Sequence, residues 1–320
     1  MDGTITRLAP SPTGALHLGN LRTFVANYLL AAQRGWKVLM RVEDIAGPRI
    51  KAGAAEALLE QLAWLGLRWS EPVVTQSHRM IEYEAALARL TSAGAAYPCI
   101  CSRKDVQAAA AAPHAEDGAI AYPGTCRGVY ASGADAAARS AGRPVAWRVK
   151  VEPGEIEVAD RFAGSRSFDL SRTCGDFVIY RGEHLPAYQL AVVVDDADAG
   201  VDAVVRGDDL LESAARQIHL RRLLGLTPAP AYWHLPLVVG PDGRRLAKRH
   251  GDTRLAHYRE AGATPQRVLG LLGAWLGALE RPAEVSMDEL LEKFDLDRVP
   301  REKIIFTEAD DRWLRGGNNR

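Results

Sequence analysis

The sequence predicts an α/β protein with a parallel sheet that is split by an insertion and followed by a short helical C-terminal segment. Three observations predict this class. The chain opens with strand, glycine- and proline-rich loop, helix and strand patterns in turn. From about residue 96 to 185 the composition shifts toward alanine, glycine and proline, and three of the four cysteines cluster within 28 residues of this stretch. Apolar runs that suit a buried sheet and its helices resume after this stretch.

The first 45 residues form a βαβ pattern. Thr4 to Ala9 has the character of a short buried strand. Apolar residues from Leu21 onward follow helical spacing, with Asn20 as the predicted N-cap and Gly35 as the stop signal. Residues 36–43 form the second predicted strand. Strands joined in this way are parallel, and ligands bind at the loops beyond their carboxyl ends.

The rest of the chain continues this sheet after an interruption. Residues 188–196 (YQLAVVVDD) form an apolar run that ends in carboxylates, which is typical of a strand buried on both faces. The other predicted elements are helices at 54–65 and 81–90, a strand at 202–206, a helix at 209–224, and helices and turns from about 255. We therefore divide the chain into the first half of the α/β domain (1–95), the insertion (96–185), the second half of that domain (186–255) and the helical C-terminal segment (256–320).

The composition limits the class of protein. The 320 residues are 47% hydrophobic and 25% charged, which is ordinary for a globular chain. Forty basic and forty acidic residues give no net charge, so a nucleic-acid partner would need a local basic surface. No apolar stretch is long enough to span a membrane, and the N-terminus lacks a secretory signal. We expect a cytoplasmic monomer with neither a membrane nor a DNA partner.

Two short motifs indicate phosphate binding. In His17-Leu18-Gly19-Asn20, His17 can donate to a phosphate, Gly19 permits close approach, and the following helix N-terminus favours an anion. This motif is weak alone, because a buried histidine beside a turn glycine gives the same pattern. Residues 240–253 (GPDGRRLAKRHGDT) begin with a turn signal and continue as a basic run that contains Lys248. An ordinary exposed basic loop is the alternative for this run.

These motifs resemble those of the class I aminoacyl-tRNA synthetases. His17–Asn20 resembles their His-x-Gly-His motif with asparagine in the last place, and the basic run resembles their Lys-Met-Ser-Lys-Ser loop with Ala247 in place of serine. Residues 7–14 (RLAPSPTG) and 248–252 (KRHGD) resemble the glutamyl branch of the class. The resemblance covers roughly residues 4–310 and is closest to the short glutamyl-queuosine tRNA(Asp) synthetases.

The resemblance implies a class I synthetase-like Rossmann catalytic domain, split by a zinc-containing insertion. It assigns the ATP site to His17, Gly19 and Lys248, and catalysis to these residues together with Asn20. The histidine and the lysine would stabilise charge on the phosphates, with Mg²⁺ assisting.

A pocket for glutamate needs two receptors for carboxylates and one for the ammonium group. Arginine suits carboxylates because its planar fork donates two parallel hydrogen bonds. Arg7 and Arg206 end two predicted strands and would face the same crevice. Glu43 could pair with the ammonium group, although an ion pair between Arg7 and Glu43 that merely bridges adjacent strands is the alternative. The resemblance assigns glutamate binding to Arg7, Leu8, Ala9, Pro10, Ser11, Glu43, Tyr188 and Arg206.

The cysteine cluster predicts a metal site. Cys99, Cys101 and Cys126 offer three thiolates, and a structural zinc ion needs a fourth ligand. His114 and Tyr122 are both candidates, and general chemistry favours the histidine. The resemblance to the short synthetases, with their Cys-x-Cys and Tyr-x3-Cys pattern, implies Tyr122 and one structural zinc per chain. Three buried reduced cysteines are the simpler alternative.

The resemblance implies that the protein activates L-glutamate with ATP in the absence of tRNA and transfers it to queuosine at the wobble position of tRNA(Asp). We expect no anticodon-binding domain, which favours the short relatives. The alternatives are a truncated glutamyl-tRNA synthetase that charges the 3′ end of tRNA(Glu), a small-molecule adenylate-forming nucleotidyltransferase, and a tRNA-binding protein without activity. The intact His17, Gly19 and Lys248 disfavour the last of these.

Overall fold

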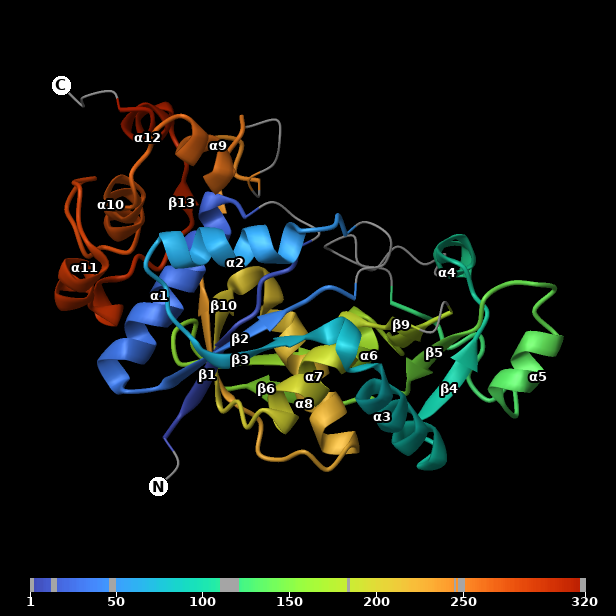
Figure 1. The fold of residues 1–320 in the computed structure, drawn as a ribbon. Helices are drawn as coiled ribbons and strands as arrows, with labels where there is room; N and C mark the ends of the chain where they lie inside the picture. The colour runs from blue at the N-terminus through green and yellow to red at the C-terminus, as the bar shows by residue number, and fades with distance from the viewer. Residues whose placement is uncertain are drawn as a thin grey trace.

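A parallel sheet lies at the centre of the computed structural model (Figure 1). The structure describes residues 3–12, 16–45, 50–109, 121–182, 185–244, 246 and 251–316. Parallel pairing joins β1 to β2, β2 to β3, and β10 to β11. Asp202 N, just before β10, donates to Ile5 O across 3.1 Å, which places β10 beside β1. These strands are β1 (Ile5–Leu8), β2 (Lys37–Val42), β3 (Ser70–Thr75), β10 (Ala203–Gly207) and β11 (Ala231–Leu235).

Helices cover both faces of this sheet. Alternate side chains of β10 enter different apolar clusters, since successive residues of a strand point to opposite faces. Ala203 and Val205 pack in the cluster that contains α1 and α10, and Val204 packs in the cluster that contains α7 and α8. These helices are α1 (Leu18–Arg34), α7 (Tyr188–Asp198), α8 (Leu211–Leu223) and α10 (Pro265–Trp275). The predicted α/β class with a parallel sheet is confirmed.

A second, antiparallel sheet with the order β4-β5-β8-β9 lies between β3 and α7 in the sequence. Figure 1 shows β4, β5 and α5 at one end of the molecule and α10, α11 (Met287–Lys293) and α12 (Glu308–Leu314) at the other. The hairpin of β6 and β7 packs against the parallel sheet, because Asp160 forms a bridge with Tyr232 of β11. The elements of this region are β4 (Ala96–Cys99), α4 (Arg103–Ala109), α5 (Gly133–Ala138), β5 (Ala146–Val149), β6 (Glu155–Val158), β7 (Arg166–Asp169), α6 (Leu170–Thr173), β8 (Val178–Arg181) and β9 (Leu185–Pro186).

Helices α10 and α11 pack on α1, and α12 packs on α10. Arg22 of α1 is fully buried and donates to Trp275 O (3.1 Å) and Pro236 O (2.7 Å), so it holds α1, α10 and the end of β11 together. None of the described helices is long and apolar enough to cross a membrane. The remaining elements are α2 (Ala54–Trp64), α3 (Met80–Ser92), β12 (Val238–Val239), α9 (Leu255–Glu260) and β13 (Ile304–Ile305).

The prediction of a strand at 188–196 is wrong, because these residues form helix α7. The helix is buried on nearly all sides, from Leu190 to Asp196 without interruption. A helix covered all round needs no polar face, so its sequence lacks the 3.6-residue period that would identify it. The change brings Asp195 and Asp196 under the sheet ends as buried carboxylates.

The prediction of Asn20 as the N-cap of α1 is also wrong. The N-cap is His17, whose backbone is extended (φ −99°, ψ 160°) and whose Nδ1 accepts from Asn20 N at 3.3 Å. The imidazole nitrogen therefore supplies the acceptor that a serine or aspartate usually provides at this position. The helix begins three residues earlier than expected.

Candidate active site

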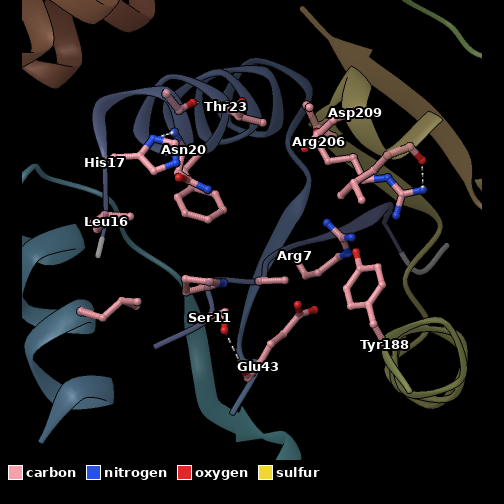
Figure 2. Close-up of a pocket in the computed structure, with 18 of the residues that line it drawn as sticks. Arg7, Ser11, Leu16, His17, Asn20, Thr23, Glu43, Tyr188, Arg206 and Asp209 are labelled. Atoms are coloured by element: carbon pink, nitrogen blue, oxygen red, sulfur yellow. Dashed lines mark hydrogen bonds between the residues drawn. The ribbon is translucent and has the colours of Figure 1, made fainter. Parts of the chain in front are cut away.

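A cavity of about 660 Å³ opens at the carboxyl ends of β1, β2 and β10 (Figure 2). It gathers predicted residues from four separate parts of the chain. Leu8 does not line it, since its side chain is fully buried in the apolar core. Lys248 lies outside the described residues. The predicted residues that line the cavity are Arg7, Ala9, Pro10, Ser11, His17, Gly19, Asn20, Glu43, Tyr188 and Arg206.

The start of α1 forms one wall of the cavity. A neutral His17 ring that accepts at Nδ1 carries its proton on Nε2, which can donate to a phosphate. A Cβ added at Gly19 would lie 3.2 Å from the His17 ring, so glycine leaves room for the imidazole in its capping position. The HxGN spacing thus has a local structural cause as well as a chemical one.

Backbone hydrogen bonds join this wall to the chain that follows the basic loop. Leu18 N donates to Thr253 O across 3.1 Å, and Leu255 N donates to Leu16 O across 2.9 Å. His17 and Arg254 form an antiparallel bridge between these two bonds. The first motif and the residues that directly follow the basic run are therefore adjacent in space, although about 230 positions of the sequence separate them.

A buried cation lies beneath the opposite wall. Arg41 on β2 donates to Glu43 (3.0 Å) and to Asp196 (2.5 Å), and its Nε lies 3.7 Å from Asp195. Burial raises the pKa of Glu43 above its usual value, although the charge of Arg41 opposes the change. The charge of Arg41 therefore offsets only part of the effect of burial on the pKa of Glu43. The sequence analysis missed Arg41, although residues two apart on a strand share one face.

Arg7 has a different partner from the one considered in the sequence analysis. Its Nε donates to Asp196 across 3.3 Å, whereas the cation bonded to Glu43 is Arg41. Burial acts to raise the pKa of Asp196, but Arg41 and Arg7 outweigh it and hold this pKa below its usual value. Asp196 is thus an anionic support that orients Arg7 toward the cavity. In Figure 2 the Arg7 guanidinium lies near Tyr188.

Two hydrogen bonds fix the guanidinium of Arg206. Its Nε donates to His234 Nε2 across 2.9 Å, and its Nη2 donates to Leu210 O across 3.2 Å. Its Nη1 is buried and has no hydrogen-bond partner among the described residues. An unpaired buried N–H of a cation is costly, and a ligand carboxylate would relieve that cost.

Tyr188 and Ser11 complete the site. Tyr188 is the first residue of α7. Burial is the main cause that raises the pKa of its phenol, and the charge of the nearby Glu43 adds to it, so the phenol stays protonated. Ser11 Oγ donates to Glu43 O across 2.9 Å, and Glu43 N donates to Pro10 O across 2.9 Å. These bonds fix the loop after β1 against the end of β2. Asp209, in the short 3-10 helix Asp208–Leu210, also lines the cavity, and the sequence analysis did not select it.

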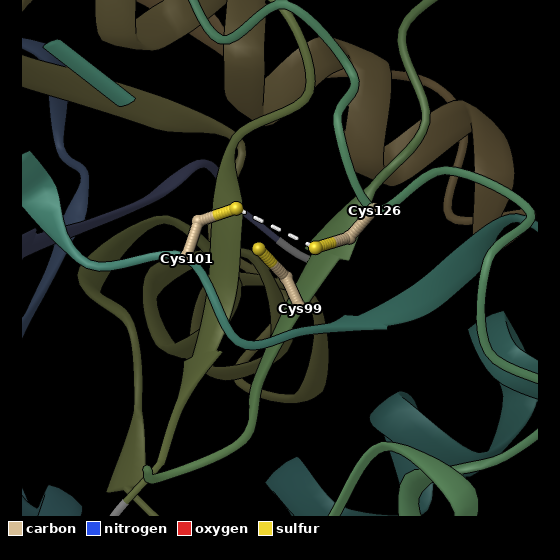
Figure 3. A group of neighbouring side chains, drawn as sticks. All are labelled: Cys99, Cys101 and Cys126. Atoms are coloured by element: carbon tan, nitrogen blue, oxygen red, sulfur yellow. Dashed lines mark hydrogen bonds between the residues drawn. The ribbon is translucent and has the colours of Figure 1, made fainter. Parts of the chain in front are cut away.

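The three predicted cysteines lie together in the antiparallel region (Figure 3). The sulfurs of Cys99, Cys101 and Cys126 all lie within 4.8 Å of one another, and all three thiols are free. The Tyr122 oxygen lies 3.4 Å from Cys99 Sγ and 3.6 Å from Cys101 Sγ, and it accepts from Cys126 N at 2.9 Å. The alternative ligand His114 lies outside the described residues.

This cluster has the dimensions of a tetrahedral metal site. Zinc–sulfur bonds of about 2.3 Å and a zinc–oxygen bond of about 2.0 Å place two sulfurs roughly 3.8 Å apart and sulfur and oxygen about 3.5 Å apart. The sulfur–oxygen distances of 3.4 and 3.6 Å and the Cys101–Cys126 distance of 3.4 Å are close to these values. The residues present therefore fit a zinc ion.

Comparison with known proteins identifies the family. The family model described as tRNA synthetases class I (E and Q), catalytic domain, matches residues 4–310. The glutamyl-Q tRNA(Asp) synthetase of Nocardia farcinica is 50% identical over 307 residues, which cover 96% of this chain and 94% of that protein. The protein of the same name from Symbiobacterium thermophilum is 45% identical, over 97% of this chain and 98% of that protein.

Solved structures agree with this result. A glutamate tRNA ligase from Elizabethkingia meningosepticum, determined in complex with its amino acid, superposes with a TM-score of 0.79 at 27% identity. The match covers 98% of this chain and 69% of that one. The chain belongs to the class I tRNA synthetases of the E and Q type, and within them to the glutamyl-Q tRNA(Asp) synthetase family.

Proposed function

We propose that this protein activates L-glutamate with ATP in the 660 Å³ cavity and transfers it to queuosine in tRNA(Asp). The names of relatives that are 41–50% identical over nearly the whole chain support this acceptor. The observation that carries the glutamate assignment is the convergence of Arg7, Arg206 and Glu43 on the cavity.

The charges suit a dicarboxylic amino acid. Arg206 and Arg7 would each receive one carboxylate, with Tyr188 as a neutral donor and wall. The ammonium group would lie beside Glu43. The raised pKa of that residue supports this placement, because a further cation would favour its ionised form.

ATP would bind between the start of α1 and the basic loop, as Mg–ATP. The α-carboxylate of glutamate attacks the α-phosphate, the bond to the β-phosphate oxygen breaks, and pyrophosphate leaves. We assign the stabilisation of phosphate charge to His17 Nε2 and Lys248, with Gly19 and Asn20 shaping the approach. A hydroxyl of the acceptor RNA then attacks the acyl carbon and AMP leaves. These steps require positioning and charge stabilisation, and no covalent enzyme intermediate.

The cysteine cluster would hold one structural zinc ion through Cys99, Cys101, Cys126 and Tyr122. When bound, the ion would cross-link the start of the antiparallel region, where the local apolar cluster is small. Reduced thiolate ligands suit the cytoplasm, which is the compartment that we propose.

Transfer of radiolabelled glutamate to purified tRNA tests this function. The acceptors are tRNA(Asp) with queuosine, tRNA(Asp) without it, and tRNA(Glu). We expect label only on the first, and glutamate-dependent ATP–pyrophosphate exchange without any RNA. Label on tRNA(Glu) would refute the acceptor and leave the glutamate site standing. Exchange that does not depend on glutamate would refute the amino-acid assignment.

A further inference from the structure

We propose that Asp160 and His234 form a buried relay that positions Arg206 and thereby sets the affinity for glutamate. The inference rests on the proposed role of Arg206 as a carboxylate receptor. Neither Asp160 nor His234 lines the cavity, so both act through the arginine. They are positioning residues, and they come from different parts of the chain: the β6–β7 hairpin and strand β11.

The relay is a continuous line of hydrogen bonds. Asp160 Oδ2 lies 2.6 Å from His234 Nδ1, and Arg206 Nε donates to His234 Nε2 across 2.9 Å. Both the His234 and Asp160 side chains are fully buried. Strands β10 and β11 pair Arg206 directly with His234, so the two side chains emerge from neighbouring positions of the sheet.

The arginine fixes the tautomer of the histidine. A guanidinium N–H can only donate, so His234 Nε2 must accept and the single proton of the neutral ring lies on Nδ1. The Nδ1–H group of His234 therefore donates to Asp160 Oδ2. Burial lowers the pKa of His234 despite the opposing bond to Asp160, which keeps the ring in the neutral form that the relay requires.

Asp160 is itself firmly held. Its Oδ1 accepts from Phe162 N (2.9 Å) and Ala163 N (2.6 Å), and its Oδ2 accepts from His234 N at 3.1 Å. The carboxylate thus joins the turn after β6 to β11. A displacement of this turn would move His234 and, through it, Arg206.

The relay determines where the remaining donor of Arg206 points. A guanidinium is planar, so anchoring Nε on His234 and Nη2 on Leu210 O fixes both its plane and the direction of Nη1. Nη1 is the buried donor without a described partner. Arg206, Arg7 and Tyr188 face the same cavity in Figure 2, so a ligand carboxylate there can accept from Nη1.

Glutamate-dependent pyrophosphate exchange in purified variants tests the relay. His234→Leu removes the acceptor for Arg206 and should raise KM for glutamate about tenfold or more, with KM for ATP unchanged. His234→Gln places an amide oxygen within reach of Arg206 and should recover most of the glutamate affinity. Asp160→Asn puts an amide donor among groups that donate to the carboxylate, and should raise KM for glutamate while sparing ATP.

Arg301→Ala is the matched control for damage to the hairpin. Arg301 donates to Phe162 O and stacks on the Phe162 ring at 4.1 Å, next to Asp160 but outside the relay. An equal effect of Arg301→Ala on KM for glutamate, or a parallel rise of both KM values in His234→Leu, would overturn the relay. Wild-type protein without glutamate-dependent exchange would contradict the proposed function itself. Exchange that His234→Leu leaves unchanged would contradict the relay alone.

Discussion

Arg41 Nη2 donates to Glu43 Oε1 across 3.0 Å, so the base of the cavity is a buried ion pair two residues apart at the end of β2. The same guanidinium also contacts Asp195 and Asp196 of α7. One cation therefore serves three carboxylates, and it joins the sheet to the helix that carries Tyr188.

Replacing Arg41 with methionine should destabilise the protein by about 3–5 kcal/mol, because it removes the buried cation that Glu43, Asp195 and Asp196 share. Urea unfolding measures the loss. Arg79→Met is the control, since Arg79 also binds Asp195 but from a partly exposed position, and we expect a smaller loss there. Equal losses in the two variants would show that the carboxylates under the cavity do not depend on Arg41.

His17 offers a separation of its structural and chemical roles. His17→Ala loses both the N-cap and the phosphate donor, and should cost about 1 kcal/mol of stability and about 100-fold in pyrophosphate exchange. His17→Asn keeps a capping acceptor for Asn20 N but removes Nε2. We expect it to restore thermal stability and not exchange. Recovery of exchange in the asparagine variant would mean that His17 acts only as a cap.

The metal site predicts about one zinc ion per chain in protein purified without chelator, measured by elemental analysis. Cys126→Ser and Tyr122→Phe should each lower zinc affinity, and Cys126→Ser should do so more strongly because thiolate is the better ligand for zinc. Competition with a chromophoric chelator reports the order. Wild-type affinity in Tyr122→Phe would exclude Tyr122 and direct attention to His114.

Stability should fall on acidification through the titration of His234. Its pKa is lowered by burial, so between that value and the unfolded value of about 6.5 the unfolded chain binds more protons. The stabilising effect of the neutral ring is present above about pH 6.5 and is lost as the pH falls, by at most about 1.4 kcal/mol per pH unit. Urea unfolding between pH 7.5 and 5.5 should show a shallower slope in His234→Gln, with the exposed His78→Gln as control. Identical slopes in wild type and His234→Gln would contradict this assignment.

Elements with a clear period or clear boundaries could be predicted from sequence. The strands at 4–9, 36–43 and 202–206 and the helices at 54–65, 81–90 and 209–224 agree with the structure to within one or two residues. Strand β3 escaped notice because Pro72 lies within it, and proline usually counts against a strand. Helix α7 was misread because burial on all sides removed its period.

The cavity residues that could be predicted are those in recognisable motifs or at the ends of predicted strands. Residues that support the cavity residues without lining the cavity lack a sequence signal, because nothing in the sequence distinguishes such an aspartate or histidine from any other buried one. Asp160 lies 74 positions from His234, and only the folded sheet brings them within hydrogen-bond distance. Asp195 and Asp196 did stand out, as two acids ending an apolar run, but they were assigned to the end of a strand.

The position of β1 has a consequence for synthesis of the chain. On one side β1 pairs with β2, and on the other side it lies next to β10. The residue that bonds Ile5 from the β10 side is Asp202, which is 197 residues later in the sequence. At about 5–20 residues per second, a ribosome needs roughly 10–40 s to synthesise the residues between them. During this time the nascent chain carries an open strand edge, the kind of surface that pairs with other chains and that chaperones shield. Slowing translation between the two halves would therefore favour aggregation of this protein.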